Sequence, residues 1–395
     1  MQQLHGTVMN YAWGTSDAIP AILGEQPSGS PVAEYWLGAH ASSPSTLDGG
    51  TLPQLIGSDP DVLGGASREA FGDQLSFLLK ILSAGSPLSL QAHPNRQQAE
   101  VGFARENEAG LALDDPVRSY KDSWPKPEII VALSPFEALY GFREPLLTAV
   151  LFAGLGLGDR LDAVIGPLTH RTGSAALAEV FLDVLSLDDE RRQLLDEVAA
   201  AAVNHVDDPG ELGLFARTIV DLDEKFPGDP GLLGALLMNR LTLQPGEALF
   251  VDAGVMHAYL SGTGIEVMGN SDNVIRGGLT AKHIDVEGLL QVVDFTPWTP
   301  DVIRPIEVAP GVWSYGARCP EFEVWKLTVA PGTPVTLPGD GSARVALLTA
   351  GHVEFAGTSG TLNLHQGQSA FVAADEAAVV LTGDADIYVA ASGRR

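Results

Sequence analysis

Strict alternation of apolar and polar residues predicts a β-strand over residues 87–94. A strand turns successive side chains to opposite faces, so a period of two separates a buried face from an accessible one. The apolar set is Leu88, Leu90 and Ala92, and the polar set is Ser89, Gln91 and His93. We therefore expect the polar set to lie together, with its back to an apolar layer.

Similar patterns divide the rest of the chain. Residues 1–142 are mostly short apolar or alternating runs broken by Gly, Pro, Ser and Asp, which predicts antiparallel strands, with a helix over 95–110. From about 145 to 239, apolar residues recur every three to four positions and predict helices. Strand patterning resumes at about 241 and continues to about 295. Residues 299–395 have short strands with Gly at the turns, typical of a small barrel or sandwich.

A second motif lies at residues 245–260. A strand predicted over 247–251 turns at 252–254, and the next strand places His257 and Tyr259 on one face. A glycine turn just before an inward histidine is typical of a cupin-type barrel. The sequence therefore predicts a mainly β fold with a helical insertion. Its expected parts are a cupin-like β-barrel catalytic domain (1–143 and 240–298), an all-α inserted domain (144–239) and a C-terminal cupin-like β domain (299–395).

Four residues in three segments indicate a metal site. Glu128 begins an apolar run that predicts a buried strand, and a buried carboxylate needs a partner. Together with Gln91, His93 and His257 it gives two imidazoles, a carboxylate and an amide oxygen, which suit Zn, Fe or Mn. Either histidine taken alone is more typical of an ordinary buried residue. In the C-terminal domain, His352 and His365 lack an acidic or amide companion at ligand spacing, so that domain is expected to be metal-free.

The charge distribution favours a small anionic substrate. The formal net charge of −27 argues against nucleic acid or an anionic membrane as a partner. The chain nevertheless has lysine beside the predicted ligands. Only six lysines occur in it, and four lie in or near these segments: Lys80, Lys121, Lys126 and Lys282. Cations concentrated in this way indicate a phosphorylated substrate, although pairing with nearby carboxylates is the alternative.

Residues 264–285 form a polar segment dense in donors and acceptors. Asn270, Ser271, Asp272 and Asn273 are followed by Arg276 and a Gly-Gly pair, and Lys282 comes soon after. A guanidinium and an ammonium suit a phosphate or an enediolate.

The sequence constrains the cellular compartment and the oligomeric state of the protein less strongly. The chain lacks a charged-then-apolar N-terminal segment and any apolar run of about 18 residues, and Cys319 is its single cysteine. We expect a cytoplasmic protein, a monomer or weak homo-oligomer.

The motifs together resemble the type I phosphomannose isomerase family. Besides the segments above, the resemblance is carried by Tyr11-Ala-Trp-Gly, Ala33-Glu-Tyr-Trp-Leu-Gly-Ala-His, Phe77-Leu-Leu-Lys-Ile-Leu and Ser134-Pro-Phe-Glu-Ala-Leu-Tyr-Gly-Phe-Arg. It covers residues 1–143 and 240–295. It implies one zinc ion per chain, held by Gln91, His93, Glu128 and His257. It also implies interconversion of mannose 6-phosphate and fructose 6-phosphate through an enediolate, in the service of mannose use or GDP-mannose supply.

The resemblance also implies a substrate pocket. Its residues here would be Trp13, Lys80, Ser89, Lys126, Tyr259, Glu266, Arg276 and Lys282. Arg276 and Lys282 are expected to hold phosphate or enediolate charge. Two other enzymic or binding functions stay open: a metal-dependent cupin dioxygenase, and a sugar-phosphate-binding protein without turnover.

One departure from the family pattern affects the proton carrier. Family members commonly read Asp-x-Asn-His-Lys-Pro-Glu, whereas Trp124 and Pro125 replace the Asn-His pair here. The candidates in the matched segments are Lys126, Asp272, Glu266 and Lys282. A lysine beside a metal has a depressed pKa, which makes Lys126 the first choice and Lys282 the second. His40 and His283 are alternatives for the missing imidazole.

Overall fold

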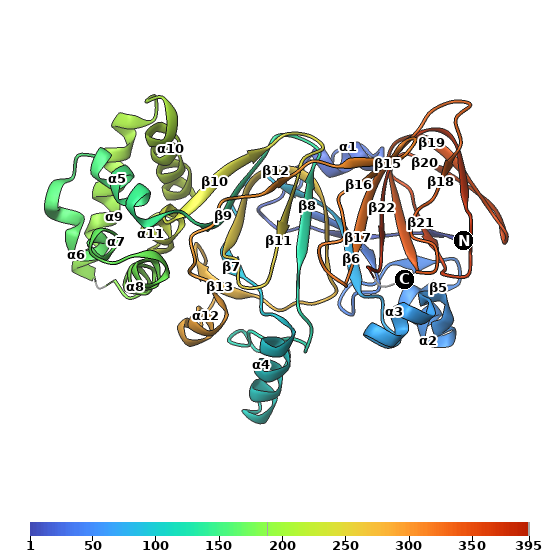
Figure 1. The fold of residues 1–395 in the computed structure, drawn as a ribbon, viewed down its shortest axis with the longest axis horizontal. Helices are drawn as coiled ribbons and strands as arrows, with labels where there is room; N and C mark the ends of the chain where they lie inside the picture. Colours follow the sequence, from blue (N-terminus) through green and yellow to red (C-terminus); the bar gives the residue numbers. More distant parts are fainter. Residues whose placement is uncertain (188, 394–395) are drawn as a thin grey trace.

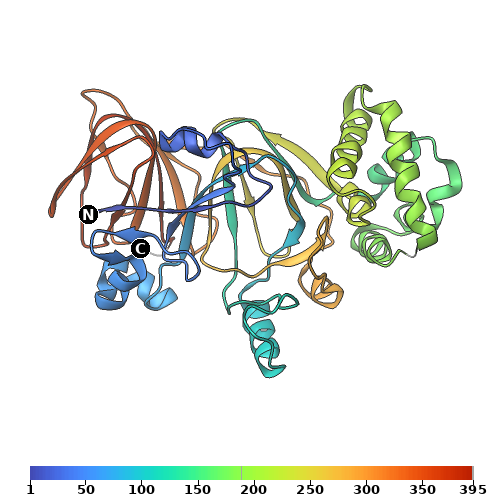
Figure 2. The same ribbon diagram turned by 180° about the vertical axis from the view of Figure 1, so that it is seen from behind.

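The computed structural model describes residues 1–187 and 189–393. A helical region lies at one end, a β region lies in the middle, and a second β region lies at the other end (Figure 1). Seen from behind, both termini lie in the second β region (Figure 2). The fold is therefore mainly β with helices added, as the sequence predicted.

The central β region carries the predicted ligands. Its long sheet has the strand order β14-β11-β8-β12-β6-β3-β2, and β9, β10, β7 and β13 are joined to it through β12. The strands are β2 (Thr7–Met9), β3 (Glu34–Gly38), β6 (Phe77–Ala84), β7 (Leu90–Ala92), β8 (Glu128–Ala132), β9 (Phe136–Phe142), β10 (Met238–Leu243), β11 (Ala248–Val251), β12 (His257–Gly269), β13 (Ile275–Gly278) and β14 (Val302–Ile303). Antiparallel pairing throughout this region fits the predicted antiparallel texture.

Strand β6 shows that the central sheet is buried on both faces. Every residue of β6 is buried. Leu79 and Ile81 join a core shared with the C-terminal sheet, including Val345 and Leu347. The alternate positions face the other way, and one of them is the charged residue Lys80. A lysine inside such a strand must be paired to be tolerated.

Short helices interrupt the central region. They are α1 (Ala18–Leu23), α2 (Leu52–Ser58), η1 (Pro60–Leu63), α3 (Gly65–Phe71), α4 (Arg96–Glu108) and α12 (Val286–Val292), and a small hairpin is made by β4 (Thr46–Leu47) and β5 (Gly50–Thr51). The helix predicted over 95–110 is confirmed as α4, with Asn95 as its N-cap. The prediction of strand texture up to residue 295 is wrong at α12, which Asp285 caps. Helix α2 was missed, although Thr51 and Gln54 form a capping box.

The helical region is a bundle-like insertion between β9 and β10. Its elements are α5 (Pro145–Gly154), η2 (Gly158–Leu161), α6 (Asp162–Ile165), α7 (Pro167–His170), α8 (Gly173–Leu185), α9 (Asp189–Ala202), η3 (Val203–His205), α10 (Gly210–Lys225) and α11 (Gly231–Leu236). Strand β10 already begins at Met238, within the range predicted for the insertion. None of the helices in the described part of the chain has the length and apolar character that a bilayer span requires.

The C-terminal sheet packs against the face of the central sheet that carries Leu79 and Ile81. It contains β1 (Gln2–Leu4), β15 (Ile306–Ala309), β16 (Val312–Ser314), β17 (Glu323–Val329), β18 (Val335–Thr336), β19 (Arg344–Gly357), β20 (Gly360–His365), β21 (Ser369–Val372) and β22 (Val380–Ala391). Strand β1 pairs with β21, so the first strand of the chain belongs to this sheet. Ile129, Val131 and Ile265 of the central sheet share one apolar cluster with Tyr388 and Ala390.

Candidate metal centre and substrate pocket

Three fully buried side chains converge near one end of the central sheet. His93 follows β7, Glu128 begins β8, and His257 begins β12. Nε2 of His93 lies 3.3 Å from Glu128 Oε1, and Nε2 of His257 lies 3.3 Å from Glu128 Oε2. One ligand atom from each residue lies within 4.8 Å of the others, a spacing that fits a shared metal ion.

The free atoms of this cluster have the chemistry of metal ligands. Nδ1 of His93 lies 2.8 Å from the carbonyl oxygen of Asn273, and Nδ1 of His257 lies 3.1 Å from that of Val255. A carbonyl can only accept, so the proton of each ring sits on Nδ1 and leaves a lone pair on Nε2. Both Nε2 atoms and Oε2 of Glu128 are buried without a hydrogen-bond partner. Burial also lowers the pKa of His93 to about 4, which keeps the ring neutral.

Gln91 lies beside the triad in the sheet. Strand β7 spans only Leu90–Ala92, so Ser89 and His93 flank it rather than lie within it. Gln91 is directly opposite His257 on β12 and directly opposite Arg276 on β13. Residues opposite one another in an antiparallel pair have close Cβ atoms and share a face. This register places the predicted amide ligand next to the buried triad.

Lys126 completes the surroundings of Glu128. Its Nζ lies 3.0 Å from Glu128 Oε1, and it is 9% exposed. Burial disfavours the carboxylate, but the Lys126 charge and the contacts from His93 and His257 outweigh it and hold the pKa of Glu128 well below its usual range. Glu128 is therefore ionised in this arrangement.

A row of charges crosses the interior face of the sheet. Trp36, Lys80 and Glu266 are direct partners across β3, β6 and β12. Nζ of Lys80 lies 3.2 Å from Glu34 Oε1 and 3.2 Å from Glu266 Oε2, and 4.8 Å from the centre of the Trp36 ring. Burial opposes the ammonium, but the two carboxylates outweigh it and raise the pKa of Lys80. Sequence reasoning identified Lys80 and Glu266 and missed Glu34, two residues before Trp36 on the same face.

Tyr259 and Trp13 add polar and aromatic surface to this region. The Tyr259 hydroxyl is buried without a partner within hydrogen-bond geometry. Burial, reinforced by the nearby carboxylates of Glu266 and Glu128, raises its pKa well above the usual value. Trp13 stacks on Tyr11 with ring centroids 5.7 Å apart. A hydroxyl without a partner at this depth is suited to a polar ligand.

Arg276 and Lys282 form a cationic group with Lys121. Among the described residues, neither Arg276 nor Lys282 forms an ion pair. Burial lowers the pKa of Arg276, and burial together with the charges of Arg276 and Lys121 lowers that of Lys282. Like charges gathered without carboxylates indicate a place for an anion. Lys121 is held by the carbonyl oxygens of Leu113 and Asp115.

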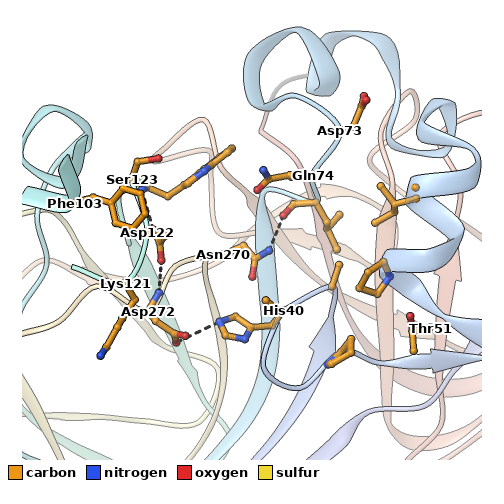
Figure 3. A pocket seen from close by; sticks show the side chains of 18 residues that line it. His40, Thr51, Asp73, Gln74, Phe103, Lys121, Asp122, Ser123, Asn270 and Asp272 are labelled. Carbon is orange, nitrogen blue, oxygen red and sulfur yellow. Dashed lines mark hydrogen bonds and ion pairs between the residues drawn. The ribbon is translucent and has the colours of Figure 1, made fainter. Parts of the chain in front are cut away.

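A cavity of about 740 Å³ is lined by the loop that carries Asp272 and does not include the ligands of the metal centre. Its wall contains His40, Lys121, Asn270 and Asp272 (Figure 3). Trp124 also lines it. Nε2 of His40 lies 3.2 Å from Oδ1 of Asp272. The Trp124 ring packs on the guanidinium of Arg96, whose Cζ lies 4.6 Å from the ring centroid.

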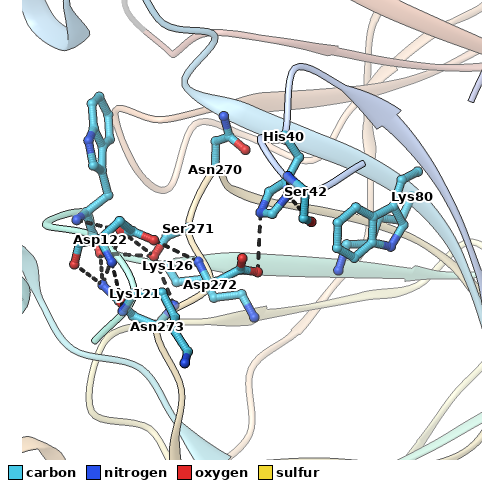
Figure 4. A network of polar contacts seen from close by, with 12 residues as sticks. His40, Ser42, Lys80, Lys121, Asp122, Lys126, Asn270, Ser271, Asp272 and Asn273 are labelled. Atoms are coloured by element: carbon cyan, nitrogen blue, oxygen red, sulfur yellow. Dashed lines mark hydrogen bonds and ion pairs between the residues drawn. The ribbon is translucent and has the colours of Figure 1, made fainter. Parts of the chain in front are cut away.

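The loop that carries Asp272 is fixed by Asp122 and Asn273 (Figure 4). Asp122 Oδ1 accepts from the Ser271 hydroxyl at 2.9 Å, and Oδ2 accepts from the backbone N–H of Asp272 at 2.9 Å. The amide of Asn273 donates to the carbonyl oxygens of Asp122 and Trp124, both at 2.9 Å. The sequence predicted that this loop binds a ligand. In the structure, many of its polar groups instead form hydrogen bonds within the protein that hold the loop in place.

Comparison with known proteins places this geometry in a family. Residues 1–145 match the model of the phosphomannose isomerase type I catalytic domain. The chain is 35% identical to mannose-6-phosphate isomerase of Escherichia coli (strain K12) over 393 residues, 97% of either protein. The chain belongs to the type I phosphomannose isomerase family. The human mannose-6-phosphate isomerase is 32% identical over 424 residues, covering 97% of this chain and 96% of that protein.

Solved structures of the family share the whole fold. A crystal structure of zinc-bound mannose 6-phosphate isomerase superposes with a TM-score of 0.89 at 33% identity and covers 99% of both chains. The apo form from Salmonella typhimurium gives a TM-score of 0.90 at 33% identity, again over 99% of both chains. The predicted resemblance to the type I phosphomannose isomerases is therefore confirmed, and it extends to the helical and C-terminal regions.

Proposed function

We propose that this chain is an aldose–ketose isomerase that interconverts mannose 6-phosphate and fructose 6-phosphate and depends on one zinc ion. The observation that carries the proposal is the trio of buried, unpartnered ligand atoms on His93, Glu128 and His257. Gln91, opposite His257, is the proposed fourth ligand. Two imidazole nitrogens with oxygen ligands suit catalytic zinc, because such sites keep a position open for substrate. When bound, the ion supplies a Lewis acid next to the sugar oxygens.

The protein side chains have separate proposed tasks. The isomerisation moves a proton between C1 and C2 and passes through an enediolate, whose negative charge must be stabilised by fixed cations. Arg276 and Lys282 are proposed to hold this charge or that of the phosphate, since neither is neutralised by a carboxylate among the described residues. Lys126 is proposed as the carbon-proton carrier, because it lies buried against Glu128. Asp272, half-exposed in the cavity wall, is proposed to act on the sugar hydroxyls.

The remaining predicted residues are proposed to bind the sugar. Lys80 and Glu266 offer a buried donor and acceptor pair, and Tyr259 offers an unpartnered hydroxyl. Trp13 offers an aromatic face, and Ser89 offers a hydroxyl beside Gln91. Aromatic faces flanked by polar groups match the apolar and hydroxylated surfaces of a sugar.

The wider setting is also a proposal. We assign residues 1–143 and 240–298 to a cupin-like catalytic domain, 144–239 to a helical domain and 299–395 to a metal-free, cupin-like β domain. The protein is proposed to act in the cytoplasm as a monomer or weak homo-oligomer, supplying mannose use or GDP-mannose synthesis. Its net charge of −27 supports a small phosphorylated partner over nucleic acid or membrane.

A coupled assay for fructose 6-phosphate tests the proposed function. Purified protein should convert mannose 6-phosphate, lose that activity after prolonged chelation and regain it with zinc. Elemental analysis should give about one zinc per active chain. Absence of turnover in the zinc-loaded protein would contradict the proposal, and oxygen uptake with a sugar would point to the dioxygenase alternative.

A further inference from the structure

His40 is the one buried histidine, among the described residues, that does not belong to the candidate metal centre. It is 5% exposed, whereas the other buried histidines are His93 and His257. It lies just after β3, the strand that carries Glu34 and Trp36, and its ring contacts the Trp36 ring with centroids 4.9 Å apart. An imidazole that contacts a carboxylate in the cavity wall can favour the ionised form of that carboxylate.

The contacts of the His40 ring orient its proton. Nδ1 accepts the backbone N–H of Ser42 at 3.3 Å and lies 2.9 Å from the Ser42 hydroxyl. Because a backbone N–H can only donate, Nδ1 carries the lone pair and Nε2 carries the proton of the neutral ring. Nε2 faces the Asp272 carboxylate at 3.2 Å. The Nε2–H group of His40 is therefore a donor that faces an acceptor, the Asp272 carboxylate.

The Asp272 carboxylate contacts this donor and feels the charges of Lys126 and Lys80. Its backbone N–H is held by Asp122, so the start of its side chain is fixed (Figure 4). Burial opposes ionisation, but the hydrogen bond from His40, with the charges of Lys126 and Lys80, outweighs it and lowers the pKa of Asp272. The titratable groups that act on this carboxylate or feel its charge are His40, Lys80, Lys126, Asp122 and Tyr11.

We propose that His40 is a positioning residue that holds Asp272 ionised and aimed at the sugar. This chain has Pro125 at the position where family members commonly have a histidine. The proposal rests on the isomerase function. Converting an aldose to a ketose moves one proton from C2 to C1 and a second from the O2 hydroxyl to O1. The Asp272 carboxylate takes the O2 proton and delivers it to O1, which restores the carboxylate and requires no other reagent.

The test compares two replacements of His40. In His40→Asn the amide reaches the position of Nδ1 but not that of Nε2, so the contact with Asp272 is lost while the Ser42 end can be kept. In His40→Gln the longer side chain returns an N–H to the Nε2 position. We expect kcat to fall about 10- to 100-fold in His40→Asn with KM changed less than about twofold, and to recover most of this loss in His40→Gln.

The pH profile separates positioning from a structural role. An ionised Asp272 is active above its pKa, and activity falls as the pH drops through that value. Without the His40 donor the pKa rises, so the acid limb of kcat/KM should move to higher pH in His40→Asn and return in His40→Gln. His205→Asn is the matched control, because it removes another histidine–aspartate pair, with Asp208 at 2.7 Å, in the helical region. It should leave rate and profile unchanged.

A double variant completes the test, with zinc content measured in every protein. His40→Asn should cost nothing further in an Asp272→Asn background, because the two residues act as one unit. An unshifted acid limb in His40→Asn, or losses that multiply in the double variant, would overturn the proposal. If His40→Asn does not fold, the test is made at Asp272, whose side chain is half-exposed. Wild-type turnover in Asp272→Asn would then overturn the proposal. Lack of turnover in the wild-type protein would instead refute the isomerase function.

Discussion

The ammonium of Lys126 lies 3.0 Å from Oε1 of Glu128, two residues along the chain. A cation is thus in direct contact with a carboxylate proposed as a zinc ligand. Since the other oxygen of Glu128 faces His257, the carboxylate joins the metal centre to the group proposed to carry the proton. Because of this contact, a change at Lys126 can affect both proton transfer and zinc binding. An experiment on Lys126 therefore has to measure activity and zinc content together.

His257→Ala should abolish zinc binding and turnover while leaving the fold in place. The imidazole supplies one of the buried lone pairs, whereas the strand around it is held by its apolar neighbours and by pairing with β9. Elemental analysis and circular dichroism measure the two effects. His352→Ala, which removes an exposed histidine of the C-terminal sheet, is the control. Full zinc content in His257→Ala would contradict the assignment of His257 as a metal ligand.

Arg276→Ala should lower kcat/KM for mannose 6-phosphate by about 10- to 100-fold or more with zinc retained. A hydrogen bond to a charged group is worth about 1.5–3 kcal/mol, and the charge it holds grows in the transition state. Steady-state kinetics with mannose 6-phosphate and with mannose measure the effect. Arg318→Ala removes an exposed arginine paired with Asp301 and should change nothing. Similar efficiency on mannose and mannose 6-phosphate in the wild type would contradict a phosphate site.

Lys126→Met should abolish exchange of solvent tritium into the substrate while the substrate still binds. A methionine keeps the length and burial of the side chain and removes the amine that would carry the proton. Exchange at saturating substrate, with zinc content as the control, separates a proton carrier from a simple anchor, which would bind weakly and still exchange. Wild-type exchange in this variant would remove Lys126 from the mechanism.

Lys80→Met should destabilise the protein by about 3–5 kcal/mol. It leaves Glu34 and Glu266 buried without their shared cation, and an uncompensated buried charge is costly. Urea unfolding monitored by fluorescence gives the difference. Lys326→Met breaks a more exposed pair with Asp386 and should cost at most about 1 kcal/mol. Equal stability of the two variants would show that the buried row of charges is not structurally important.

The sequence by itself determined the local features that depend on chain neighbours. Alternation around Gln91 placed that residue and His93 among apolar neighbours, and the apolar run after Glu128 placed its carboxylate at the start of a buried strand. The capped helix α4 was also readable, because Asn95 and Gln98 form a capping box. Helix α12 was misread as strand since it is only seven residues long, too short for its period to be distinguished.

Only the tertiary structure decided which distant residues meet. The pairing of Lys80 with Glu34, the pairing of His40 with Asp272, and the entry of β1 into the C-terminal sheet all join positions far apart in sequence. Strand order and register set these contacts, and no local pattern encodes them. The physical reason is that alternation fixes the face on which a side chain lies, whereas the partner across that face depends on which strands pair and in what register.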